Sequence, residues 1–189
     1  SKFYYRKSII IPNAIDFNKR TYSKDKNKFK FIYIGRYAVK VKGLDLLIQT
    51  FINLKDWCKE NNVVLELYGP LEKNEELDLL KAKIKDNKCS HYIKINGPVF
   101  GDKKAQKLQE ASVFIQTSRH EGQPMGIIEA LSYGIPCLVT YETSFGEDCI
   151  KNECGIGVNF SEDELKNSII KIYEDKDYLK KCEKNAIIY

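Results

Sequence analysis

Short apolar runs alternate with longer segments of mixed polarity along most of the chain. The short runs are rich in β-branched and aromatic residues, as in "KFKFIYIG" at 28–35, and are typical of buried strands. The longer segments repeat apolar residues at the spacing of one helix face. The pattern predicts strands at 28–35, 63–70, 92–98, 113–118, 136–141 and 155–160, and helices at 44–60, 74–86, 103–111, 124–134, 161–174 and 175–189.

Strands that alternate with helices in this way form a parallel sheet. We therefore predict an α/β, Rossmann-like fold, with a parallel sheet of about six strands and helices on both faces. Residues 1–27 break the pattern and are interpreted as an interdomain linker and lead-in, 28–174 as the sheet domain, and 175–189 as a carboxyl-terminal helix. Since the chain starts without Met or a signal-peptide pattern, we expect an amino-terminal domain to precede it in a longer protein.

Composition narrows the class of protein. With 43% hydrophobic residues the chain can bury a core, and no apolar run approaches the roughly 20 residues of a membrane span. The net charge of +5 comes from lysines interleaved with acids, which does not favour a nucleic-acid partner. Six cysteines without a C-x-x-C pair indicate reduced thiols, and hence a cytoplasmic protein without a zinc site. The basic start, "YYRKS", leaves two interpretations open, a plain linker or a peripheral contact with anionic lipid at the inner face of the membrane.

The topology itself predicts where a ligand binds. In open α/β sheets, ligands bind outside the carboxyl ends of the strands, among the strand-to-helix loops. These loops are predicted at 36–43, 69–73, 97–102 and 119–124, and they carry several glycines together with two of the arginines. We therefore predict a site for a polar, anionic ligand at this edge of the sheet.

The first of these loops has a pair of basic residues suited to a diphosphate. Neither G-x-G-x-x-G nor G-x-x-x-x-G-K-[ST] is present, which counts against a dinucleotide oxidoreductase and a P-loop nucleotidase. In "GRYAVKVKG" (35–43), Arg36 can fork onto a diphosphate, and Lys42 adds a mobile point charge. Two solvated basic residues would show the same spacing, so this alternative stays open.

The last loop, "EGQPMG" (121–126), has the features of a helix start that binds phosphate. Pro124 suits the first helical turn, so the N–H groups of Met125 and Gly126 would face an anion. Gly122 has no Cβ and lets the backbone approach a ligand closely.

Two glutamates flank this helix start. Glu121 lies level with the anion site, and because a diphosphate would repel it, a neutral hydroxyl is its expected partner. Glu129 lies about 7.5 Å further along the helix, about the distance from a diphosphate to the far side of a ribose. A helix N-terminal acid and a solvated acid are the alternative interpretations, although Glu129 stands in an otherwise apolar segment where an acid needs a partner.

These residues resemble the retaining glycosyltransferases of family four, which have the two-domain GT-B fold. Glu121 and Glu129 reproduce the family's two glutamates with seven residues between them, and "GRYAVKVKG" looks like its Gly-Arg…Lys-Gly loop. The segment "IPNAID" (11–16) is similar to the linker that enters its carboxyl-terminal domain, and "ELYGP", "INGPV" and "NECGIGV" have counterparts in the same order. The resemblance covers residues 11–160.

The resemblance implies a function. The chain would be the nucleotide-sugar-binding domain of an enzyme that transfers a hexosyl group from a UDP-, GDP- or ADP-linked donor to a glycan or lipid-linked acceptor. The acceptor would bind to the absent amino-terminal domain, so the fragment alone would turn over little sugar. No cofactor or metal is implied, and the acceptor would attack from the front face with help from the leaving phosphate.

The resemblance also implies roles for single residues. Arg36 and Lys42 would hold the diphosphate and neutralise the leaving group. Glu121 would bind hydroxyls of the transferred sugar, and Glu129 those of the ribose. The base would lie against the loop 97–99 with Leu108 as a wall. The full set of implied substrate-binding residues besides Glu129 is Gly35, Gly97, Pro98, Val99, Leu108, Gly122, Gln123, Pro124, Met125 and Gly126.

Departures from the family pattern leave some questions open. Ala14 stands where the linker commonly has Gly, and Gln123-Pro124-Met125 replaces the frequent Phe-Gly-Leu, which leaves the transferred sugar open. Arg119 is interpreted as part of a surface ion pair, and His120 as a residue of the loop surface. The alternative functions are a non-catalytic nucleotide-sugar-binding module, half of a nucleotide-sugar epimerase, and a pure interaction module.

Overall fold

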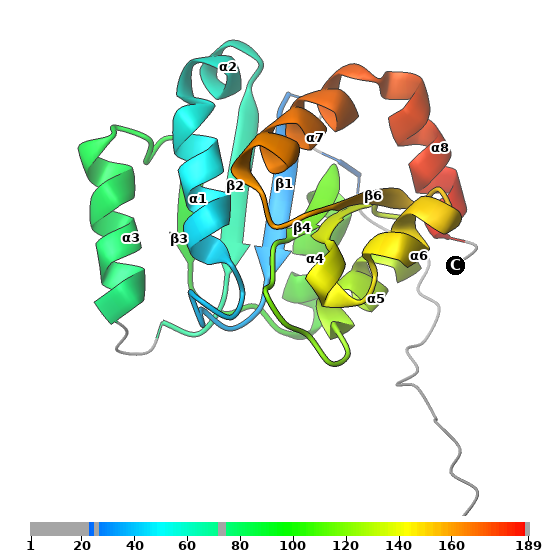
Figure 1. The fold of residues 1–189 in the computed structure, drawn as a ribbon, viewed down its shortest axis with the longest axis horizontal. Helices are drawn as coiled ribbons and strands as arrows, with labels where there is room; N and C mark the ends of the chain where they lie inside the picture. Colours follow the sequence, from blue (N-terminus) through cyan, green and yellow to red (C-terminus); the bar gives the residue numbers. More distant parts are fainter. Residues whose placement is uncertain (1–22, 25–26, 72–74, 188–189) are drawn as a thin grey trace, which may run out of the picture.

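Six parallel strands form one sheet in the order β3-β2-β1-β4-β5-β6 in the computed structural model, which describes residues 23–24, 27–71 and 75–187 (Figure 1). The strands are β1 (Phe29–Ile34), β2 (Val63–Tyr68), β3 (Ile93–Asn96), β4 (Val113–Gln116), β5 (Cys137–Thr140) and β6 (Gly155–Val158). The helices are α1 (Leu44–Asn53), α2 (Lys55–Glu60), α3 (Glu75–Asp86), α4 (Gly101–Glu110), α5 (Met125–Ser132), α6 (Gly146–Lys151), α7 (Glu162–Glu174) and α8 (Lys176–Ala186). The predicted α/β, Rossmann-like fold is confirmed.

Alternate residues of β1 supply two cores, one on each face of the sheet. Phe31 and Tyr33 belong to the core under α1, α3 and α7, and Figure 1 shows α1 and α7 in front of the sheet. Ile32 belongs to the second core, which α4 and α5 cover. Helix α8 contacts β6 and joins both cores, because its Leu179 lies in the first and its Ala186 in the second.

Two helical boundaries differ from the sequence predictions. The helix expected at 44–60 is divided at Leu54, which leaves helical geometry (φ −91°, ψ 15°) while its side chain stays buried. A six-residue helix, α6, forms between β5 and β6, where only a loop was expected. Six residues make less than two turns, too few for the apolar periodicity that predicts a helix. Most of the predicted linker 1–27 lies outside the described residues.

The chain reverses its winding direction between β1 and β4. From β1 the chain moves outward through β2 to β3 and then returns to the other side of β1, where β4, β5 and β6 follow in order. The loops that leave β1 and β4 therefore diverge to opposite faces of the sheet and open a crevice between them. This switch point brings the loop with Arg36 and the loop with Glu121 together.

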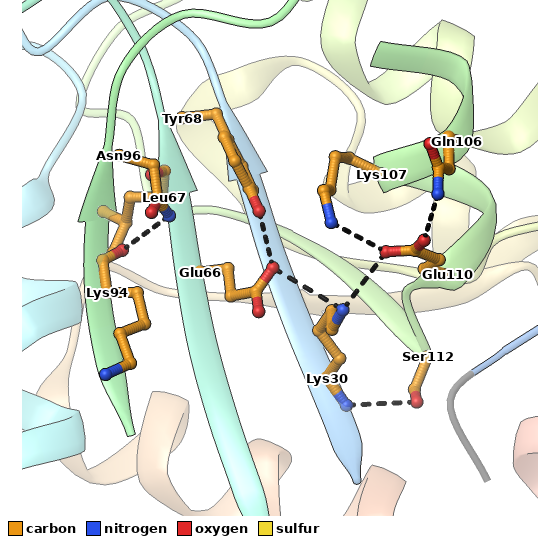
Figure 2. Close-up of polar contacts among 10 residues, drawn as sticks. All are labelled: Lys30, Glu66, Leu67, Tyr68, Lys94, Asn96, Gln106, Lys107, Glu110 and Ser112. Carbon is orange, nitrogen blue, oxygen red and sulfur yellow. Dashed lines mark hydrogen bonds and ion pairs between the residues drawn. The ribbon is translucent and has the colours of Figure 1, made fainter. Parts of the chain in front are cut away.

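A buried lysine near the amino end of β1 fastens α4 to the sheet. The Lys30 ammonium of β1 lies 3.6 Å from Glu66 Oε2 and 3.5 Å from Glu110 Oε2 (Figure 2). The Tyr68 hydroxyl donates a 2.8 Å hydrogen bond to Glu66, and Lys107 donates one of 3.0 Å to Glu110. Burial acts to raise the pKa of Glu110, but the hydrogen bond from Lys107 holds that pKa below its usual range. Ion pairs thus set the position of the helix that follows the β3 loop.

Candidate functional site

A cavity of about 470 Å³ lies at the carboxyl ends of β1 and β4, the edge toward which the strand arrows point in Figure 1. Its volume is in the range of small-ligand sites. Nine of the predicted site residues line it, namely Gly35, Arg36, Lys42, Pro98, Val99, Glu121, Gln123, Met125 and Gly126. The structure therefore brings together most of the positions that the sequence placed in four separate loops.

The residues after β1 are held so that Arg36 reaches the cavity. The Tyr33 hydroxyl donates a 2.8 Å hydrogen bond to the carbonyl of Arg36 and fixes the turn. A Cβ on Gly35 would lie 2.6 Å from that hydroxyl, so the turn has no room for a side chain there. Burial, together with the negative charge of Glu121, raises the pKa of Tyr33, and its hydroxyl stays a hydrogen-bond donor at neutral pH. The guanidinium of Arg36 makes no ion pair with any other described residue and is available to a ligand.

A left-handed glycine brings Lys42 onto β4. Gly43 has φ +60° at the start of α1, and a Cβ there would overlap with the carbonyl oxygen of Thr117. The Thr117 hydroxyl donates a 2.9 Å hydrogen bond to the Gly43 carbonyl. These contacts dock the loop 36–43 against the end of β4, and Lys42 forms an ion pair with Glu121.

Glu121 has three donors on one oxygen. Its Oε1 accepts hydrogen bonds from Gln116 Nε2 at 2.7 Å and Ser118 Oγ at 2.8 Å, in addition to the ammonium of Lys42. Its side chain is 10% exposed and that of Lys42 is 16% exposed. This cluster was not predicted, and the expected contact of Glu121 with a neutral hydroxyl of a ligand stays a prediction. Gln116 and Ser118 were missed, although polar residues at the end of the apolar run "VFIQTS" were a usable signal.

The start of α5 packs tightly against the strands, with one correction to the expected phosphate site. A Cβ on Gly126 would lie 2.9 Å from the Phe114 ring, so this glycine lets the helix approach the sheet. Pro124 is buried and caps α5, which begins at Met125. The Met125 N–H was predicted to face a phosphate, but it donates to the Gln123 carbonyl at 3.0 Å. The proline removes one donor, and the tight turn uses the next.

Glu129 lies on α5 beside the cavity and is paired with a second lysine. Its carboxylate forms an ion pair with Lys104 of α4, and the side chains are 27% and 29% exposed respectively. Lys104, which was not predicted as a site residue, lines the cavity. The expected contact of Glu129 with a ribose stays a prediction.

Four predicted site residues besides Glu129 do not line the cavity. Leu108 is 1% exposed and belongs to the second core, because its side chain points from α4 to the sheet. A Cβ on Gly122 would meet no atom within 4 Å, so the fold itself does not require a glycine there. Gly97 and Pro124 do not line the cavity either. Gly69 and Pro70 of the predicted loop 69–73 and Phe100 of the loop 97–102 do line it, together with five residues that were not predicted, namely Tyr33, Ile34, Tyr68, Lys104 and Gln116.

Arg119 is a structural residue, as the sequence analysis favoured. Its guanidinium donates two 2.8 Å hydrogen bonds to Asp45 and lies 4.1 Å above the ring of Phe160. Burial acts to raise the pKa of Asp45, but the hydrogen bonds from Arg119 lower it below its usual value. Neither Arg119 nor the exposed His120 lines the cavity. Arg119 therefore clamps its loop to the start of α1.

Comparison with known proteins assigns the family. The family model for glycosyl transferases group 1 matches residues 14–188. The chain belongs to this family. The family prediction made from the two glutamates and the Gly-Arg…Lys-Gly loop is thereby confirmed.

Relatives of this group 1 glycosyl transferase chain act on different molecules. The alpha-monoglucosyldiacylglycerol synthase of Acholeplasma laidlawii is 28% identical over 194 residues, which cover 95% of this chain and 47% of the relative. The poly(glycerol-phosphate) alpha-glucosyltransferase of Bacillus subtilis is 26% identical over 162 residues, which cover 84% of this chain and 23% of the relative. The chain thus spans less than half the length of these curated relatives.

Solved structures show the same fold at lower identity. The carboxyl-terminal domain of the group 1 protein LpcC from Francisella tularensis matches with a TM-score of 0.74 at 17% identity, over 88% of this chain and 85% of that one. Anabaena HepE, solved with UDP and glucose, matches with a TM-score of 0.73 at 19% identity, over 86% of this chain and 43% of that one. These likenesses place the described domain in the GT-B architecture.

None of the helices in the described residues is both long enough and apolar enough to cross a membrane. No group of three or more His, Cys, Asp or Glu side chains in this part of the chain is arranged to hold a metal ion.

Proposed function

We propose that this chain is the donor-binding domain of a retaining glycosyltransferase. It would bind a nucleoside-diphosphate sugar and serve the transfer of its hexosyl group to a glycan or lipid-linked acceptor. The observation that carries the proposal is the convergence of Arg36, Lys42 and Glu121 on one cavity at the switch point of the sheet. Arg36, which forms no ion pair within the described part of the chain, lies beside the fixed carboxylate of Glu121, and this combination suits a ligand that joins a diphosphate to a polyhydroxyl ring.

UDP is the nucleotide that the comparisons support best. The structure of HepE holds UDP with glucose, and that of the pneumococcal transferase GtfA holds UDP with GlcNAc. One curated relative from Escherichia coli is named for a UDP-galactose donor. In this cavity the diphosphate would lie against Arg36 and the N–H of Gly126, and the sugar toward Glu121.

The proposed reaction needs charge stabilisation and positioning. The bond between the anomeric carbon and the phosphate oxygen breaks, a bond from the acceptor hydroxyl oxygen to that carbon forms on the same face, and the hydroxyl proton passes to the leaving phosphate. Negative charge grows on the diphosphate during this step, where Arg36 and Lys42 supply positive charge. Glu121, held by Gln116 and Ser118, would orient the sugar hydroxyls.

The proposal also covers the acceptor and the cellular location of the longer protein. The acceptor would be held by an amino-terminal domain of the longer protein, and the isolated chain would bind donor while turning over little sugar. We infer a cytoplasmic location, with peripheral contact at the inner face of the membrane when the acceptor is lipid-linked.

Calorimetry tests donor binding directly. UDP, GDP and ADP, each with and without its hexose, are titrated into the 189-residue chain, and we expect UDP and its sugars to bind. Arg36→Ala should weaken UDP binding by about 30-fold, because it removes a charge-assisted contact to the diphosphate. Lys103→Ala, which removes an exposed lysine outside the cavity lining, is the control and should change nothing. Equal UDP affinity in the parent and in Arg36→Ala would refute the diphosphate assignment.

Retention of the anomeric configuration is tested separately, by NMR of the product that the longer protein forms.

A further inference from the structure

Glu129 has one buried carboxylate oxygen beside a cavity that is proposed to bind an anion. Its Oε2 atom is buried, and among the described residues no hydroxyl or amide donates a hydrogen bond to it. The charge next to this oxygen is the ammonium of Lys104, which comes from a different helix and lines the cavity. Lys104 alone therefore balances the charge of Glu129 within the described part of the chain.

A diphosphate in this cavity would lie near two carboxylates, Glu121 in the lining and Glu129 behind the lining residue Lys104. Glu121 is neutralised by Lys42 and by two neutral donors, whereas Glu129 depends on Lys104. An uncompensated carboxylate at the edge of a partly water-excluded site repels a bound anion over several ångströms. Arg36 would then have to overcome this repulsion as well as hold the ligand.

We propose that Lys104 is the counter-ion that allows Glu129 and a donor diphosphate to occupy the same site. It is a positioning residue that acts through Glu129: it occupies Oε2, which leaves Oε1 to accept a hydroxyl of the nucleoside, and it cancels the repulsion on the phosphates. The inference rests on the proposed donor-binding function and deepens it. It names Lys104 as the residue that allows a negatively charged diphosphate to bind next to a carboxylate.

The fold supports this role because α4 is held in place. Lys30 of β1 pairs with Glu110 at the carboxyl end of α4, which ties this end of the helix to the sheet (Figure 2). The neighbouring Lys103 is exposed and outside the cavity lining. Two adjacent lysines of equal charge thus differ in their contact with Glu129, which provides a matched control.

A double-mutant cycle tests the proposal, with UDP as the charged probe and uridine as its uncharged companion. The parent chain, Lys104→Met, Glu129→Gln, the double variant and Lys103→Met are titrated by calorimetry or ligand-observed NMR at low and high salt. We expect Lys104→Met to weaken UDP by about ten-fold at low salt and less at high salt, and to weaken uridine by less than about two-fold, because uridine loses only the positioning of Glu129. In the Glu129→Gln background the same substitution should cost less than about two-fold, because there is no carboxylate left to neutralise. Lys104→Arg should restore UDP binding, and Lys103→Met should leave it at the parent value.

Three outcomes would overturn the proposal. An equal loss of UDP affinity on removing Lys104 with and without Glu129 would show that Lys104 contacts the phosphates directly. Equal weakening of UDP and uridine would show that Lys104 only maintains the shape of the site. Unchanged UDP affinity in Lys104→Met would refute the counter-ion while leaving the proposed function in place, whereas a parent chain that binds none of UDP, GDP and ADP would refute the proposed function itself.

Discussion

Lys42 and Glu121 on one side of the cavity, and Lys104 and Glu129 on the other, form two lysine–glutamate pairs between different elements of the fold. In the first pair the glutamate oxygen that meets the lysine also accepts hydrogen bonds from Gln116 and Ser118. In the second pair the lysine is the one described partner of the glutamate oxygen. The first pair is also less exposed, at 16% and 10% against 29% and 27%.

This difference separates a rigid half of the site from an adjustable half. Three donors on one oxygen fix the rotamer of Glu121 before a ligand arrives, as a group that orients a reacting sugar requires. A single ion pair at partial exposure is weak and can rearrange around a ligand. The two carboxylates predicted from one motif therefore differ in how firmly their side chains are held, although their charges are the same.

The largest expected effect on stability comes from displacing the loop 36–43, which carries Lys42 away from Glu121. Gly43→Ala would place a Cβ into the Thr117 carbonyl at a left-handed backbone position, and we expect a loss of about 3 kcal/mol or more in the free energy of unfolding. Gly101→Ala is the matched control, because Gly101 has φ +50° but open space around its Cβ, and should cost about 1 kcal/mol. Urea unfolding measures both. Similar losses in the two variants would mean that the contact with Thr117 does not anchor the loop.

A smaller effect follows from removing each lysine in turn. Lys42→Ala leaves Glu121 largely buried without a countercharge and should cost about 2 kcal/mol of stability, less than for a fully buried pair. Lys104→Ala removes a more exposed pair and should cost less than about 1 kcal/mol. Thermal and urea unfolding of the two variants give the comparison. A larger loss for Lys104→Ala would reverse the assignment of the rigid and adjustable halves.

The smallest expected effect is a loss of folding stability in acid. It comes from two ion pairs, one that supports the loop of Glu121 and one that supports the helix of Lys104. Asp45 clamps the loop of Glu121 through Arg119, and Glu110 anchors α4; the pKa of each carboxyl is lowered in the folded protein although burial opposes this. A folded pKa below the unfolded value of about 4 gives stabilisation that is present above that pH and is lost as the pH falls through the folded pKa.

Urea unfolding between pH 7 and pH 3 measures this dependence. Asp45→Asn should reduce the loss in acid and lower stability at pH 7 by less than about 1 kcal/mol, because the pair is partly exposed. An unchanged pH profile in this variant would show that the Asp45–Arg119 clamp does not contribute to folding stability.

Some site residues could be predicted because their position depends on chain order alone. Arg36 follows a strand directly and Glu121 follows another, so the rule for parallel sheets places both at one edge without knowledge of any contact. Leu108 shows where such reasoning ends. The family resemblance implied that its side chain forms a wall of the site, but the rotation of α4 about its axis turns it into the core and turns Lys104 to the cavity.

The sequence by itself determined the alternation of strands and helices, the edge of the sheet at which the cavity lies, and the family, because hydrophobic periodicity and short motifs are local properties. The tertiary structure alone decided which lysine meets which glutamate, that Gln116 and Ser118 hold Glu121, and that Met125 has already used its N–H. These pairings join residues of separate elements, such as Lys42 with Glu121 and Lys104 with Glu129. Their distances depend on how helices rotate and pack against the sheet, and no local pattern in the chain encodes that.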